Sequence, residues 1–188
     1  MSDTALLLDF LQQRNSSAKV ETPGPGEEAV RDMIRAAIRV PDHAWLRPWR
    51  FISIEGERRR DFGLVLEKCL HQRDPTADQG ARDKARNAPL RAPLVLVVVT
   101  AITAHPKVPA IEQRMSAGCA AHAILLAAEA QGFAGVWRTG DAAFDPAVMA
   151  ALGLDGDEEI AGFLYLGSRC GRAKSLPDLD PEKFHSRW

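Results

Sequence analysis

The 188-residue sequence predicts a single α/β or α+β domain of two or three layers, and three observations lead to this fold class. Helix-like and strand-like hydrophobic patterns are interspersed along the whole chain. The segment APLVLVVVTA, residues 92–101, is continuously apolar, which is typical of a central strand buried on both faces. No internal repeat and no linker between two cores is visible, so we expect one domain over residues 1–188.

The N-terminal part is expected to contain two helices and a strand. Apolar residues recur at i, i+1, i+4 and i+5 from Leu6, which predicts a helix that ends near Gln13. The turn-rich stretch ETPGPGEE separates it from a second helix over 29–40, which Pro41 should end. Residues 49–55 then alternate between apolar and polar side chains, as in a half-buried strand.

The middle of the chain is expected to be mainly helical around the central strand. Apolar residues from 62 to 70 predict a third helix, and the charged stretch 72–88 is either a mobile segment or a short exposed helix. Residues 111–131 form the longest predicted helix. This helix is rich in alanine and nearly uncharged over residues 115–128, so we expect it to be buried.

The last part of the chain should complete the sheet. FAGVWRTG at 133–140 reads as a short strand, residues 146–152 as a short helix and residues 158–168 as the last strand. The tail over 171–188 shows little periodicity and has too little core to fold on itself. It is therefore a segment that can wrap a partner subunit.

The composition excludes several classes of partner. A formal net charge of −1 gives no electrostatic reason to bind nucleic acid or a membrane surface. No apolar run reaches the roughly 18 residues that span a bilayer, and the N-terminus lacks the features of a signal peptide. Three widely spaced cysteines without a CxxC motif predict reduced thiols in the cytoplasm, and the histidines show no metal-ligand spacing, so no metal is expected.

Four segments carry residues that suit an anionic or planar ligand, although each alone also has a simpler explanation. Arg14 and Ser16 follow the first helix and match phosphate oxygens, but a solvated helix end is the more common cause. The loop PDHAWLRPW, residues 41–49, is unusually aromatic and basic for a connection; its tryptophans are more often core residues, and His43 alone is more often a satisfied core histidine. A strand end at 137–140 and a basic turn at 167–174 complete the set. Fingerprints of dinucleotide, P-loop and hydrolase sites are absent from the sequence.

Taken together and in order, these segments resemble the nitroreductase family of FMN-dependent flavoproteins, and particularly its small single-domain members. The resemblance rests on RNS, RVPDHAWLRPWRF, RAPLVLVVV, EQRMSAGCAAHAILLAAEAQGFAGVWRTG and GFLYLGSRCGRAK, and it covers roughly residues 5–175. It implies an α+β fold with three α/β/α layers and a central mixed, mostly antiparallel sheet. It also implies a homodimer with FMN at the interface, each site being built by both subunits.

The resemblance assigns roles to individual residues. Arg14, Asn15 and Ser16 fall on the motif that holds the ribityl phosphate, and Arg172 falls where a late basic residue closes on it. Arg39 and His43 fall on a turn that reaches the flavin from the second chain. Trp137, Arg138 and Thr139 match the segment beside the isoalloxazine ring. The segment assigned to the nicotinamide nucleotide of NADH or NADPH comprises Ala127, Ala128, Glu129, Ala130, Gln131 and Gly132.

The implied function is an NAD(P)H-dependent FMN oxidoreductase that reduces a small electron-poor acceptor, a nitroaromatic or a quinone, with ping-pong kinetics. Two alternatives remain open: a non-catalytic protein that binds or sequesters flavin, and a structural dimer whose flavin site is lost. Three positions depart from the common family pattern. Asn15 replaces an arginine, Arg47 replaces the glutamine of a QPW element, and Ala44 with Trp45 replaces small or amide residues. These departures bear on the range of acceptors more than on FMN binding.

Overall fold

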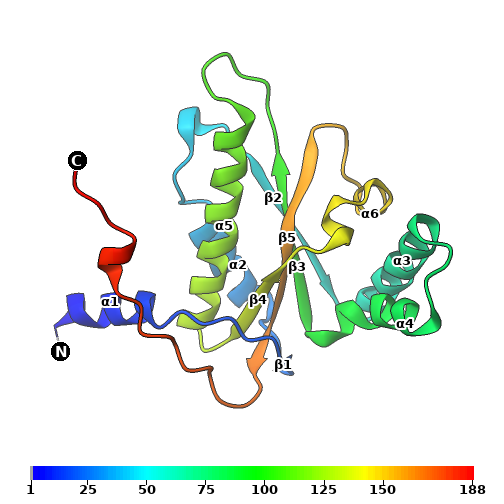
Figure 1. The fold of residues 1–188 in the computed structure, drawn as a ribbon, viewed down its shortest axis with the longest axis horizontal. Coiled ribbons are helices and arrows are strands. Elements are labelled where there is room, and N and C mark those ends of the chain that lie inside the picture. Colours follow the sequence, from blue (N-terminus) through cyan, green and yellow to red (C-terminus); the bar gives the residue numbers. More distant parts are fainter. Residues whose placement is uncertain (1) are drawn as a thin grey trace.

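The computed structural model describes residues 2–188, in which helices cover both faces of a five-stranded sheet (Figure 1). The strand order is β1-β5-β3-β2, and β4 also pairs with β5. Every pairing between the described strands is antiparallel, which satisfies the expected α+β class with a mostly antiparallel sheet. The strands are β1 Val20–Glu21, β2 Trp49–Glu55, β3 Leu94–Ala101, β4 Ala134–Arg138 and β5 Glu158–Arg169.

The central strand is β3, as its continuous apolar run predicts. Side chains of successive strand residues point to opposite faces, so each face of β3 receives its own set of apolar residues. Val95, Val97 and Val99 pack in one core cluster, whereas Leu94 and Leu96 pack in the other. All five side chains are essentially inaccessible to solvent.

Two helical layers cover these clusters and complete a three-layer fold. The first layer packs against the leucine side of β3 and consists of α2 Glu27–Ala37 and α5 Ala110–Ala130. The second packs against the valine side and consists of α3 Arg58–Arg73, α4 Gln79–Asn87 and α6 Pro146–Ala151. Between α3 and α4, a Cβ atom at Gly63 would collide with the carbonyl of Arg86, so glycine permits this close contact.

Several details differ from the expectations. Helix α2 ends at Ala37, so Pro41 does not itself end the helix. For the charged stretch 72–88, the second of the two alternatives is correct, because it contains the short helix α4, in which no residue is buried; Glu67 of α3 accepts two hydrogen bonds from the Arg86 guanidinium. Helix α5 is buried along one side only, and Met115 on its other side is 58% exposed.

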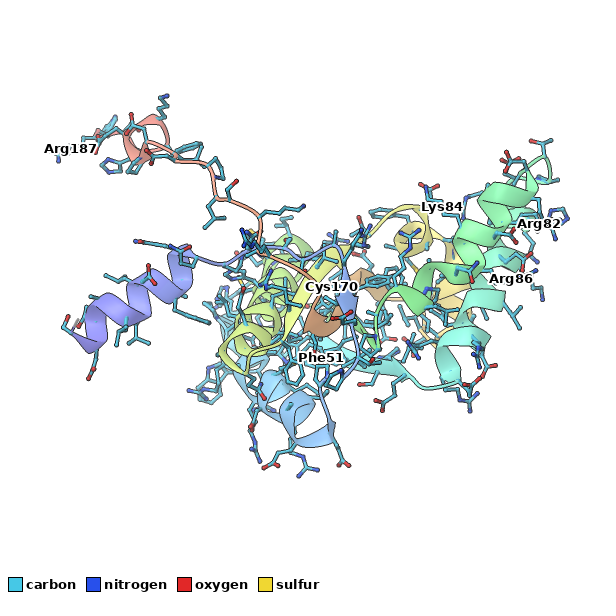
Figure 2. All side chains as sticks on the ribbon, turned by 90° about the horizontal axis from the view of Figure 1, so that it is seen from below. Phe51, Arg82, Lys84, Arg86, Cys170 and Arg187 are labelled. Atoms are coloured by element: carbon cyan, nitrogen blue, oxygen red, sulfur yellow. The ribbon has the colours of Figure 1, made fainter. Side chains whose placement is uncertain are left out.

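Helix α1 Asp3–Gln12 and the C-terminal tail lie outside the three layers. Figures 1 and 2 show both segments projecting from the same side of the body, opposite α3 and α4. No residue of α1 is buried, and the tail contains a single short turn, Pro181–Lys183. Large apolar side chains of both segments are therefore exposed in this subunit: Leu6, Leu7, Leu8, Leu11, Leu176, Leu179, Phe184 and Trp188.

The described residues also bear on membrane-spanning helices, cysteines and metal-binding groups. Within residues 2–188, no helix has the length and apolar character needed to cross a membrane. In the same residues the three cysteines are free, and no group of histidine, cysteine, aspartate or glutamate side chains is arranged to hold a metal ion.

Candidate functional site

The structure brings the N-terminal RNS segment next to the basic turn that follows β5. The Asn15 side chain donates a hydrogen bond from Nδ2 to the carbonyl of Lys174, at 2.6 Å, across 159 positions of sequence. Arg14 donates from Nη1 to Ser16 Oγ at 3.4 Å. The residues Arg14, Asn15, Ser16 and Arg172, here called the basic cluster, thus lie on two segments that are held side by side.

The charge of the basic cluster is not neutralised within the subunit. In residues 2–188, neither Arg14 nor Arg172 forms an ion pair with a carboxylate. The nearby Arg169 differs, because its guanidinium donates to Glu129 Oε1 at 2.7 Å. Guanidinium groups and hydroxyls without a carboxylate partner suit the oxygens of a phosphate.

Strand β4 leads from the basic cluster to the second group of predicted residues. The backbone N–H of Ser17 donates to the carbonyl of Gly135 at 2.9 Å, on the edge of β4 that does not face β5. Four residues further along, the chain reaches Thr139, which is exposed. At about 3.3 Å per residue, Thr139 lies about 13 Å along the chain from Gly135, the residue that contacts Ser17.

Trp137 and Arg138 point to opposite faces of β4 and have different surroundings. The Trp137 indole donates from Nε1 to the carbonyl of Ala161 at 3.1 Å, and it covers Gly162 so closely that a Cβ atom there would collide with the ring. The Arg138 guanidinium carbon lies 5.6 Å from the ring centre of Tyr165. Burial raises the pKa of the Tyr165 phenol, so this ring stays neutral beneath the cation.

Arg138 also contains an orphaned donor. Its Nε atom is buried and finds no hydrogen-bond partner in the part of the chain that the structure describes. A buried guanidinium N–H without a partner is unfavourable, so an acceptor atom from a ligand would stabilise this arrangement.

Arg138 and Thr139 open into a cavity of about 440 Å³ between β4, α3 and α4, here called the α3–α4 cavity. Its floor is aromatic, and three of its cations, Lys84, Arg91 and Arg138, form no ion pair within residues 2–188. The lining residues are Phe62, Leu66, Leu70, Arg73, Ala81, Lys84, Ala85, Ala88, Arg91, Arg138, Thr139, Gly140, Asp141, Ala142, Phe163 and Tyr165.

The sequence did not show that α4 lines this cavity. Ala81 and Ala85 lie four residues apart on one face of α4, and Ala88 follows directly after the helix, so the three form a stripe of small residues along the cavity. Small side chains on the face of an otherwise charged helix were the available signal. A ligand that fills both the cavity and the basic cluster has to be extended, with an anionic group at one end and a planar group at the other.

Arg39 and His43 lie elsewhere in the same subunit, beside the N-terminal end of α5. His43 Nδ1 is 2.7 Å from Glu112 Oε2, and Ser116 Oγ donates to the carbonyl of Pro41 at 2.8 Å. Glu129, which holds Arg169 near the basic cluster, lies 13 residues after Ser116 and therefore about 20 Å along the helix. One subunit thus does not bring Arg39 and His43 to the basic cluster.

The exposure of two loop side chains excludes the simpler explanation that each had when taken alone. The His43 side chain is 56% exposed, so it is not a satisfied core histidine. Trp45 is 80% exposed, so it is not a core residue either, whereas Trp49 is half-buried. Pro48 is buried, and it fixes the end of the loop against the body.

The segment predicted to meet the nicotinamide nucleotide forms the C-terminal end of α5. Ala128 is buried there, Glu129 is paired with Arg169, and the Gln131 amide donates to the carbonyls of Ala29 and Ala127. Ala130 and Gly132 are exposed beside them. Carbonyl groups at a helix C-terminus carry partial negative charge, which does not attract a phosphate. The assignment to this segment stays a prediction.

Comparison with known proteins gives consistent matches over nearly the whole chain. The model of the Nitroreductase family matches residues 11–168. The Escherichia coli K12 protein named "Putative NAD(P)H nitroreductase YdjA" is 43% identical over 177 residues, which cover 93% of this chain and 96% of that protein.

Solved structures share the fold. A nitroreductase-like family protein from Bacillus cereus matches with a TM-score of 0.83 at 16% identity, covering 100% of this chain and 98% of its own. A nitroreductase with bound FMN from Bacteroides fragilis NCTC 9343 matches with a TM-score of 0.72 at 18% identity, covering 96% of each chain.

Proposed function

The chain belongs to the nitroreductase family, and from this premise we propose that it is an FMN-dependent oxidoreductase. It takes electrons from NADH or NADPH and passes them to a small electron-poor acceptor, a nitroaromatic or a quinone. Ping-pong kinetics follow if donor and acceptor use the same place in turn. The observation that carries the proposal is the extended arrangement of the basic cluster, the open end of β4 and the cationic α3–α4 cavity.

The residues of this arrangement fit FMN. Arg14 and Arg172 supply positive charge that no carboxylate neutralises within residues 2–188, and Asn15 and Ser16 supply polar groups beside it. The orphaned Nε of Arg138 offers a hydrogen bond near the end of β4. When bound, the flavin supplies the redox chemistry, accepting and releasing electrons as a hydride equivalent.

The protein has to hold and orient the cofactor. In our proposal the basic cluster binds the phosphate, while Trp137, Arg138 and Thr139 contact the planar ring. The cations of the α3–α4 cavity, Lys84 and Arg91, raise the electrostatic potential near that ring, which favours a negatively charged reduced form. We assign the protons of the reaction to water.

We further propose that the active protein is a homodimer in which Arg39 and His43 of one subunit complete the flavin site of the other. The position of these residues, about 20 Å along α5 from the basic cluster, supports this arrangement. The exposed apolar side chains of α1 and of the tail over 171–188 support it too, because a partner would cover them. Residues 1–188 then form one domain whose tail wraps the partner, in the cytoplasm, where its free cysteines stay reduced.

An absorption spectrum of the purified protein tests the cofactor. Bound flavin is expected to give a yellow protein with a band near about 450 nm. Anaerobic addition of NADH and of NADPH, in separate samples, should bleach this band rapidly. A yellow protein that neither donor bleaches would favour the non-catalytic flavin-binding function, and a colourless protein that binds no added FMN would favour a structural module.

Light scattering tests the assembly. Interfaces of obligate dimers bury upward of about 2,000 Å², and we expect a dimer mass with FMN bound. A monomeric mass with FMN still bound would contradict the proposed site between two subunits.

A further inference from the structure

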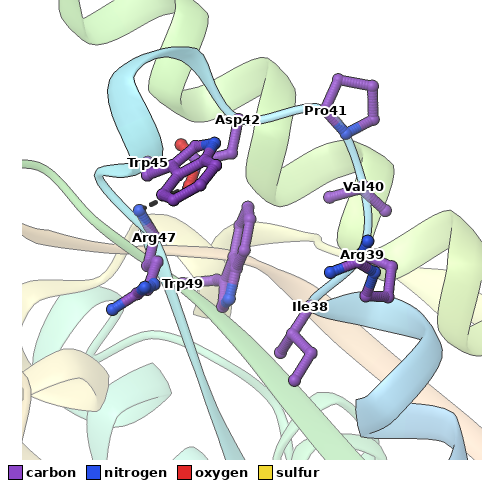
Figure 3. A pocket seen from close by; sticks show the side chains of 8 residues that line it. All are labelled: Ile38, Arg39, Val40, Pro41, Asp42, Trp45, Arg47 and Trp49. Atoms are coloured by element: carbon purple, nitrogen blue, oxygen red, sulfur yellow. Dashed lines mark hydrogen bonds between the residues drawn. The ribbon is translucent and has the colours of Figure 1, made fainter.

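The loop before β2 and the end of α2 enclose a cleft of about 670 Å³, here called the 38–49 cleft (Figure 3). Two indole rings, from Trp45 and Trp49, and two guanidinium groups, from Arg39 and Arg47, lie around it. Asp42 contributes the one carboxylate among the lining residues, and its Oδ2 accepts a hydrogen bond from the backbone N–H of Arg47 at 2.8 Å. The cleft is thus aromatic and carries an excess of positive charge.

This positive charge is available to a ligand. Within residues 2–188, neither Arg39 nor Arg47 forms an ion pair with a carboxylate. The neighbouring arginines are different, because Arg35 is paired with Asp32 at 2.7 Å and Arg50 is paired with Glu158. A guanidinium group without a partner can bind a carboxylate through two parallel hydrogen bonds.

The indole rings offer apolar area of the right shape. Trp45 is 80% exposed although tryptophan is one of the largest apolar side chains, and Trp49 is half-buried. Exposed aromatic faces bind planar rings by stacking, and cations beside them favour an anionic group on the same ligand.

The loop holds these side chains in a defined conformation. Ala44, Trp45 and Arg47 have φ angles of 60°, 55° and 51°, in the left-handed region that residues other than glycine rarely occupy. Such conformations persist only where surrounding contacts determine them, and the hydrogen bond from Ser116 Oγ to the carbonyl of Pro41 is one of these contacts. The cleft is therefore preorganised, which lowers the cost of binding.

We propose that the 38–49 cleft selects planar aromatic acceptors that carry a negative charge, such as aromatic carboxylates. Trp45 and Trp49 hold the ring, and Arg47 pairs with the carboxylate. This inference rests on the proposed function, in which the same loop forms a wall of the flavin site. It explains why Arg47 and Trp45 occupy positions where the family pattern has an amide and a small residue.

Two measurements on the purified full-length protein test the proposal. Calorimetric titration compares benzoate with benzamide, which have the same ring and differ in charge. Steady-state kinetics compare kcat/KM for 4-nitrobenzoate with that for 4-nitrobenzamide. Arg47→Gln should weaken benzoate binding and lower the ratio of kcat/KM values about ten- to hundred-fold, because it removes a charge-assisted hydrogen bond. Trp45→Ala should weaken both ligands.

The matched control is Arg35→Gln, which removes an exposed charge of α2 outside the cleft. It should leave the ratio unchanged. The proposal would be overturned if benzoate binds no better than benzamide, or if it binds equally to wild type and Arg47→Gln. A cleft that is filled by the second subunit would give the first of these results. Benzoate binding needs no electron transfer, so it decides the role of the cleft even if NADH and NADPH fail to reduce the protein, a result that would instead reject the proposed function.

Discussion

At one end of α5, the basic cluster consists of two chain segments joined by the hydrogen bond from Asn15 to the carbonyl of Lys174, and its arginines form no ion pair within residues 2–188. At the other end, the loop over 41–48 is strained, buried at Pro48 and tied to α5 at Pro41 and His43. The first region is charged, whereas the second is aromatic and has three residues with a left-handed backbone. Since about 20 Å of helix separates them, we infer that each subunit carries two incomplete halves of a site.

The largest expected effect is the loss of FMN affinity when both cations of the basic cluster are removed. Each charge-assisted bond to a phosphate contributes about 1.5–3 kcal/mol, so Arg14→Ala or Arg172→Ala alone should lower FMN affinity roughly ten- to hundred-fold. The double variant should lose at least about a hundred-fold. Fluorescence titration of the apoprotein with FMN measures this, and unchanged affinity in all three variants would mean that the phosphate binds elsewhere.

Co-expression of two different variants tests whether each site takes one half from each subunit. One chain carries Arg14→Ala with Arg172→Ala, and the other carries Arg39→Ala with His43→Ala. If each site takes one half from each subunit, about half of the co-expressed dimers are mixed and about a quarter of all sites contain no substitution.

The mixture should therefore retain more FMN, and turn over faster, than either variant alone. The control is a mixture of two preparations of the same variant, which should gain nothing. A co-expressed mixture that only equals the average of its two parents would place the whole site within one subunit.

A smaller effect is expected from His43→Ala alone. FMN affinity should fall several-fold, while the melting temperature of the apoprotein should change little, because the His43 side chain is largely exposed. Thermal melts of the apoprotein and FMN titrations of the same samples provide both values. A lowered apoprotein melting temperature with unaltered FMN affinity would give His43 a purely structural role at α5.

The smallest expected effect is a loss of folding stability at acid pH, through the ion pairs of Glu158 and Glu159 near the start of β2. The hydrogen bond from Arg50 holds the pKa of Glu158 below its ordinary value, and the hydrogen bond from Arg114 does the same for Glu159. A carboxyl whose pKa is lowered by folding stabilises the protein above its unfolded pKa, and this contribution is lost as pH falls through the folded pKa.

We therefore expect the urea midpoint of the wild type to decrease below a pH of about 4.5, and to decrease less steeply in Glu158→Gln. Glu55→Gln is the matched control, since Glu55 is exposed and forms no ion pair within residues 2–188. Equal slopes in wild type and Glu158→Gln would show that this ion pair does not anchor the start of β2.

The sequence predicted the strands whose own hydrophobic pattern is clear. Alternation over residues 49–55 gave β2 at its observed bounds, and the apolar run gave β3. Helix α2 ends three residues before the predicted Val40, since helix ends depend on tertiary contacts as much as on a following proline.

Long-range features of the site had no local signal in the sequence. The bond from Asn15 to Lys174 joins positions 159 residues apart, so only the fold shows that these segments meet. Residue type alone favours a core position for Trp45, but this side chain is 80% exposed and its backbone is left-handed. The leucines of α1 were recognised as a helical stripe, although the pattern could not show that they are exposed in this subunit.

The contact between Trp137 and Gly162 has a consequence for how members of this family can vary. The indole occupies the volume that a side chain at position 162 would need, so the two positions cannot change independently. We expect related sequences with alanine or a larger residue at position 162 to carry a smaller residue at position 137. A protein that made only one of these two replacements would have to move the end of β4, and with it Arg138 and Thr139.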